Sequence, residues 1–130
     1  MFATLPLYLV FLGTTVGLFG VALGIYLQVT PYHEIRLIRQ GNSAAAVSLG
    51  GTAIGMAIVL YSTASGTFNA LELAAWGALG LVSQILVFLV VTLILPDLKQ
   101  GMNDNKLSYG IFLGALSIAI GILNAGALST

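Results

Sequence analysis

The sequence predicts an all-α membrane protein with four transmembrane helices arranged as two repeated helical hairpins. Three observations support this fold class: four long apolar segments, charges gathered mainly in two short loops, and a likeness between the two halves. Of the 130 residues, 58% are hydrophobic and 6% are charged, whereas a soluble domain carries about 25% charged residues. The solvent for most of this chain is therefore expected to be lipid.

The four apolar segments are residues 5–29, 44–62, 73–95 and 107–128. Each can cross a bilayer, because a helix of about 20 residues spans the ~30 Å hydrocarbon core. Pro31 and Pro96 end the first and third helices. Asn42 or Ser43 is expected to cap the second helix. No Lys or Arg precedes the first segment, so we expect a retained helix rather than a cleaved signal peptide.

The two halves resemble each other, so residues 1–130 are expected to form one membrane domain built from a duplication. Shifting the chain by 64 residues lays Leu49-Gly50 on Leu113-Gly114, and a shift of 65 lays Pro31 on Pro96. The repeats cover about residues 5–65 and 70–129. With two helices per unit, both units enter the membrane from the same side.

The basic residues predict the orientation of the chain. All four lie in the loops after the first and third helices: Arg36, Arg39, Lys99 and Lys106. Short loops rich in Lys and Arg stay cytoplasmic. Both charged loops are therefore expected inside and both termini outside. Interfacial aromatic belts are expected from Tyr26, Tyr32 and Tyr109 inside, and from Tyr8, Tyr61 and Trp76 outside.

Small residues recur at spacings of four, three and four in three of the helices. The stripes are Gly13, Gly17, Gly20 and Gly24; Ala44, Ser48, Gly51 and Gly55; and Gly110, Gly114, Ser117 and Gly121. Each stripe occupies a narrow face, since successive residues are 100° apart. Such faces predict close helix packing, either within one chain or between chains.

Three polar residues within or beside the spans are candidates for a polar pathway. Gln84 lies near mid-membrane, where it is either a step in a permeation path or an interhelical hydrogen bond. Asn124, expected on the stripe face of the last helix, either lines a vestibule with Asn69 and Glu72 or bonds a backbone carbonyl. Glu72 has capping-box spacing from Asn69, and the alternative is a cation attractor.

Other site chemistry is sparse. His33 and Glu34 could form a proton relay or half of a metal site, but two ligands are too few, and a hydrated loop is the expected location. The absence of cysteine excludes thiolate chemistry, and the zero net charge offers no nucleic-acid surface. We expect no enzyme activity, cofactor or metal.

Several runs carry a family resemblance. They are Thr30-Pro31-Tyr32-His33-Glu34, Leu37-Ile38-Arg39-Gln40-Gly41-Asn42-Ser43-Ala44-Ala45, Ala75-Trp76-Gly77, Gln84-Ile85-Leu86-Val87-Phe88, and the stretch from Gly110 to Ala125. Over nearly the whole chain they resemble the YjfL-like family of bacterial inner-membrane proteins, a family of unknown function. The resemblance implies four spans, a duplicated hairpin and the bacterial cytoplasmic membrane. It supplies no catalytic residue. Its genes often neighbour membrane-stress and polyamine genes.

The chain departs from the family pattern at the entry to the last helix. The family repeats an Asn-x-Ala-Ala-Gly-like entry there, and this chain has Asn105-Lys106-Leu107-Ser108-Tyr109-Gly110. Two functions remain open. The first is an assembly subunit, linked to the envelope or stress response, with a homo-oligomer or another membrane protein as partner. The alternative is a channel or transporter subunit for ions, protons or small solutes.

Overall fold

The computed structural model describes residues 5–65 and 70–128, and every regular element among them is a helix. The elements are α1 (Leu5–Val29), α2 (Glu34–Arg39), α3 (Ser43–Ser65), α4 (Ala70–Ile94), α5 (Leu98–Asn103) and α6 (Leu107–Leu128). The four long helices are long and apolar enough to cross a membrane. The predicted all-α fold with four spans is confirmed.

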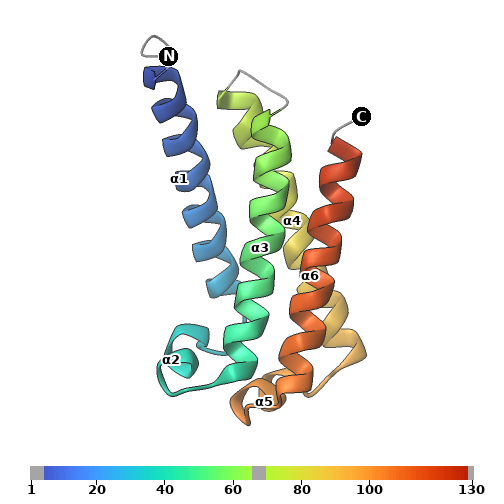
Figure 1. The fold of residues 1–130 in the computed structure, drawn as a ribbon. Helices are drawn as coiled ribbons and strands as arrows, with labels where there is room; N and C mark the ends of the chain where they lie inside the picture. The colour runs from blue at the N-terminus through green and yellow to red at the C-terminus, as the bar shows by residue number, and fades with distance from the viewer. Residues whose placement is uncertain (1–4, 66–69, 129–130) are drawn as a thin grey trace.

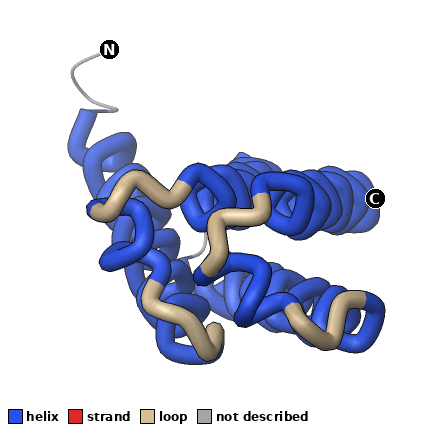
Figure 2. Tube along the Cα trace, turned by 90° about the horizontal axis from the view of Figure 1, so that it is seen from below, coloured by secondary structure: helices blue, strands red, loops and turns tan. Residues whose placement is uncertain are grey.

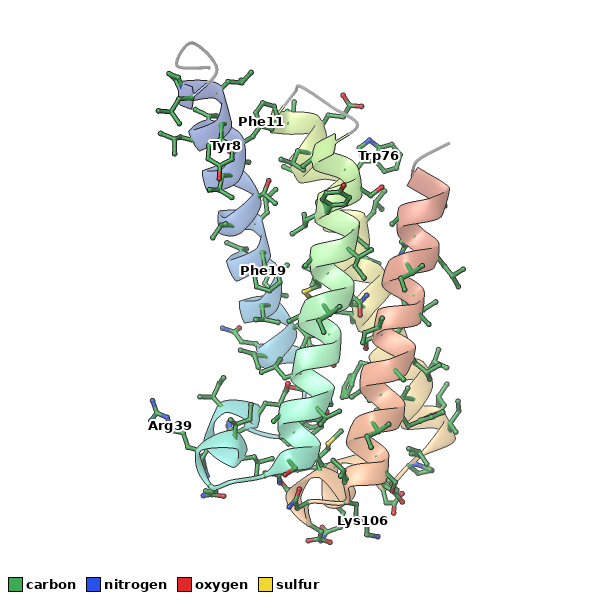
Figure 3. All side chains as sticks on the ribbon, viewed as in Figure 1. Tyr8, Phe11, Phe19, Arg39, Trp76 and Lys106 are labelled. Atoms are coloured by element: carbon green, nitrogen blue, oxygen red, sulfur yellow. The ribbon has the colours of Figure 1, made fainter. Side chains whose placement is uncertain are left out.

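The long helices form a bundle whose two ends differ in character (Figure 1). The start of α1 and the end of α6 lie at one end, and the short helices α2 and α5 lie at the other. Figure 2 views the bundle from that second end and shows the helices and the loops that join them. We call it the loop end. Arg39 and Lys106 lie there, whereas Tyr8 and Trp76 lie toward the opposite end (Figure 3).

The sequence did not predict the two short helices. α2 follows Pro31 and begins with a bond from the Leu37 backbone N–H to the His33 carbonyl, 2.9 Å long. Gly41, with φ at +85°, then lets the chain reverse into α3. α5 follows Pro96 in the same way, so a long, a short and a long helix occur twice. The duplication itself stays a prediction.

The stripes on α3 and α6 face each other within the chain. A Cβ on Gly51 would lie under 3 Å from backbone atoms of Gly114, and a Cβ on Gly110 would meet the backbone of Ala44. Nearer the other end of the pair, a Cβ on Gly121 would lie 2.5 Å from the Gly55 carbonyl oxygen. The two helices therefore run side by side in parallel with their backbones in contact, which only small residues permit.

The stripe on α1 has no such neighbour among residues 5–65 and 70–128. Cβ atoms built on Gly13, Gly17, Gly20 or Gly24 meet nothing within 4 Å. Tyr26 is the only fully buried residue of α1, and Phe19 lies where α1 runs beside α3 (Figure 3). Whether the α1 stripe packs against a second chain stays a prediction.

Candidate functional site

Two asparagines join the halves of the protein at the loop end. Asn42 caps α3, because its Oδ1 accepts from the Ala45 backbone N–H at 2.8 Å, while its Nδ2 donates to the Met102 carbonyl at 2.6 Å. The Oδ1 of Asn105 accepts from the Ala44 backbone N–H at 3.0 Å. The predicted Asn42 cap is confirmed. Asn105 precedes α6 in the chain, but its side chain bonds to the start of α3. The entries to α3 and α6 are therefore not equivalent.

Gln84 lies in the interior of the bundle with no solvent exposure. Its Nε2 donates to the Ser117 carbonyl of α6 at 3.1 Å, and its Oε1 has no hydrogen-bond partner among the described residues. The Thr52 hydroxyl of α3 lies 3.3 Å from the Ser117 hydroxyl. Thr52, Ser117 and Gln84 therefore form a continuous polar connection across α3, α6 and α4.

This connection continues toward the loop end through tyrosines. Tyr26 and Tyr32 are 1% and 3% exposed, and each packs edge-to-face on Phe88, with ring centroids 6.1 and 6.2 Å apart. Tyr26 interacts with the Thr52 hydroxyl. The expected interfacial placement of Tyr26 and Tyr32 is therefore wrong: both rings fill the core, because α4 supplies an aromatic surface for them.

Glu34 is the buried acid of this cluster. It is 2% exposed, and the Thr30 hydroxyl donates to its Oε1. Its Oε2 and the Tyr32 hydroxyl have no hydrogen-bond partner among the described residues. The expectation of a hydrated loop is wrong for Glu34, because α2 folds back and turns this side chain inward. Its neighbour His33 is exposed.

Burial changes the acidity of this cluster. Loss of solvation raises the pKa of the Glu34 carboxyl to about 7, and the Thr30 hydroxyl opposes the shift. Burial, together with the nearby Tyr26 and Glu34, also raises the pKa of the Tyr32 phenol. The Glu34 carboxyl can therefore take up or release a proton near neutral pH.

A polar cleft at the loop end brings basic side chains together. Its lining includes Tyr32, His33, Arg36, Gln40, Lys99 and Asn103. Two of the four predicted topology residues, Arg36 and Lys99, thus meet there. Arg39 and Lys106 are not among its lining residues. Lys106 instead lies over the Tyr109 ring, 5.5 Å from its centroid, and the Tyr109 hydroxyl donates to Asp97 at 2.9 Å.

The other predicted polar-pathway residues lie apart from Gln84. Asn124 lines an open, largely apolar groove between α4 and α6, together with Leu116 and Ile120. Glu72 lies exposed in the first turn of α4 and is not part of that groove. Asn69, and with it the capping box, lies outside the described residues.

The described residues hold no group of three His, Asp or Glu side chains that could ligate a metal. Sequence reasoning missed the Glu34 cluster, although one signal existed. A lone acid followed by apolar residues three and four positions later, at 37 and 38, could have indicated a short helix with one face turned inward.

The fold and its buried polar groups define a polytopic α-helical membrane protein. The chain belongs to the family described as Domain of Unknown Function (DUF350), whose model matches residues 1–128. The inner membrane protein YjfL of Escherichia coli strain K12 is 36% identical over 105 residues, covering 81% of this chain and 80% of that protein. The transmembrane protein YshE of Bacillus subtilis is 26% identical over 109 residues, covering 82% and 81%. No solved structure matches. The resemblance to the YjfL-like family is confirmed.

Proposed function

We propose that this protein is a non-enzymatic assembly subunit of the bacterial cytoplasmic membrane, and that it associates through α1 with a second copy or another membrane protein. The observation that carries the proposal is the open stripe of α1. Four glycines share one face of this helix, and Cβ atoms built on them meet nothing within 4 Å. The equivalent stripes of α3 and α6 are already occupied by each other. In lipid, small residues favour close helix association.

The proposed location and orientation have separate support. Relatives bear the names inner membrane protein and transmembrane protein. Arg39 and Lys106, one from each charged loop, lie at the loop end (Figure 3), which we place in the cytoplasm, with both termini outside. A link to the envelope or its stress response rests on the gene neighbourhoods of the family.

The assembly is tested with two matched glycine substitutions. Gly17 of α1 and Gly50 of α3 both have open space where a Cβ would be. Gly17→Leu is expected to convert the oligomer to monomer in lipid nanodiscs or mild detergent, whereas Gly50→Leu is expected to leave it intact. Oligomer mass is measured by light scattering. A monomeric wild-type protein, or an unchanged oligomer in Gly17→Leu, would contradict the proposal.

The polar connection formed by Thr52, Ser117 and Gln84 favours a second candidate function, a subunit that conducts protons or small cations. Gln84, Ser117 and Thr52 offer polar groups at a depth where lipid offers none. Ion and proton flux into liposomes would be compared for the wild type, Gln84→Leu and Ser83→Ala. Ser83 is the matched control because its hydroxyl donates only within α4, to Leu79. Conduction predicts flux that Gln84→Leu abolishes in a well-folded protein.

A further inference from the structure

We infer that Glu34 is a reversible proton-binding site, and that a row of buried hydroxyls connects it to Gln84 in the middle of the bundle. The site is independent of the proposed assembly, which rests on α1 glycines. Its ligand is the proton, taken up from the loop end and held on a carboxyl oxygen.

The immediate surroundings of Glu34 favour a protonated carboxyl over a permanent carboxylate. The side chain is 2% exposed, and its one described hydrogen bond comes from the neutral Thr30 hydroxyl. Its Oε2 has no partner among the described residues, and the same is true of the Tyr32 hydroxyl in the same cluster. A buried charge without a counter-ion is costly, so such a group takes a proton instead.

The titratable groups around Glu34 come from α1, the turn before α2, α2 itself and α5. Tyr26 of α1 and Tyr32 of the turn both interact electrostatically with Glu34, and a charge on Glu34 raises the pKa of the Tyr32 phenol. Basic side chains occur nearby in the loop-end cleft, which His33, Arg36 and Lys99 line and Glu34 does not. α3 contributes the hydroxyls of Ser48 and Thr52, and α4 contributes Phe88.

From this site the polar groups continue into the membrane-spanning region. Tyr26 interacts with Thr52, the Thr52 hydroxyl lies 3.3 Å from the Ser117 hydroxyl, and the Ser117 carbonyl accepts from Gln84. Glu34 and Tyr26 interact electrostatically, whereas the contacts of Thr52 with Ser117 and of Ser117 with Gln84 are hydrogen bonds, and such polar groups polarise one another in a low-dielectric interior. A change of charge at Glu34 is therefore felt at Gln84, which lies ten residues before the end of α4.

The test uses the fact that the chain has two glutamates, Glu34 and Glu72. In the Glu72→Gln variant, Glu34 is the sole glutamate, so carbon-13 labelling of glutamate reports on it alone. The side-chain carboxyl resonance is followed in lipid nanodiscs between about pH 4 and pH 9. We expect one titration with a midpoint at least about one pH unit above the ordinary glutamate value. A midpoint at the ordinary value, or no titration across the range, would overturn the site.

Two further variants test the neighbours of the carboxyl. Thr30→Val removes the hydroxyl that stabilises the ionised form, so the midpoint is expected to rise. The Gln84 side-chain amide resonance is expected to shift with the same midpoint as Glu34. Thr52→Val is expected to abolish that shift and leave the Glu34 midpoint in place. Thr92→Val is the control, since its hydroxyl donates within α4 to Leu89. A Gln84 resonance that does not change with pH in the wild type would contradict the proposed connection between Glu34 and Gln84.

Discussion

Gly51 of α3 and Gly114 of α6 touch through their backbones. A Cβ on Gly51 would lie under 3 Å from the Cα, carbonyl carbon and carbonyl oxygen of Gly114. A Cβ on the neighbouring Gly50 would meet nothing within 4 Å, because Gly50 lies about 100° away from Gly51 around the helix. The position of Gly51 therefore has no room for a side chain, whereas the adjacent position of Gly50 has room for one.

This contrast makes the first prediction. Gly51→Ala is expected to lower the free energy of unfolding by about 1–3 kcal/mol, because the backbones must move apart to accept the methyl group. Gly50→Ala is expected to change it little, since its methyl group faces open space. Thermal unfolding in detergent, followed by circular dichroism, measures both. Equal midpoints for the two variants would contradict the close contact between α3 and α6.

A second prediction concerns Asn42, whose amide caps α3 and also bonds the Met102 carbonyl. Asn42→Ala is expected to destabilise the protein by about 1–3 kcal/mol, because it loses both the cap on α3 and the hydrogen bond to the Met102 carbonyl. Asn42→Ser keeps a cap acceptor but loses the donor, so its unfolding midpoint is expected between those of the wild type and Asn42→Ala. Ser43→Ala, at an exposed neighbour, is the control. Full stability in Asn42→Ala would contradict the link between the two halves.

These contacts show which features of the fold can be predicted from sequence. The long helices follow from apolar length, and their ends follow from Pro31 and Pro96. The burial of Glu34, Tyr26 and Tyr32 could not be predicted in this way, because it depends on where α2 folds and on Phe88, a residue more than fifty positions away. Local composition marks these residues as polar loop or interface, and tertiary packing overrides it.

A third prediction concerns orientation. The chain has no cysteine, so single cysteines can be introduced and labelled without background. Gln40→Cys, exposed at the loop end, is expected to react with an impermeant maleimide only after the cells are permeabilised. Ser129→Cys, beyond the described residues, is expected to react in intact cells. Labelling of Gln40→Cys in intact cells, with Ser129→Cys protected, would reverse the predicted topology.

The last prediction follows from the raised pKa of Glu34. A shift from the ordinary pKa of 4.5 to about 7 means that the folded protein holds the Glu34 proton more tightly than the unfolded chain does. The resulting stabilisation is complete below about pH 4.5 and is lost as pH rises through about 7. Over that window the loss amounts to about 3 kcal/mol. The thermal midpoint of the wild type is therefore expected to fall by several degrees between about pH 5 and pH 8.

Two variants decide whether Glu34 causes that fall. Glu34→Gln cannot ionise, so its thermal midpoint is expected to vary much less over the same range. Glu72→Gln changes the exposed glutamate at the opposite end and is expected to keep the wild-type slope. Comparing slopes rather than absolute midpoints separates proton binding from any packing cost of the glutamine. A Glu34→Gln protein with the wild-type slope would mean that another group carries the pH dependence, because the substituted side chain has no proton to lose.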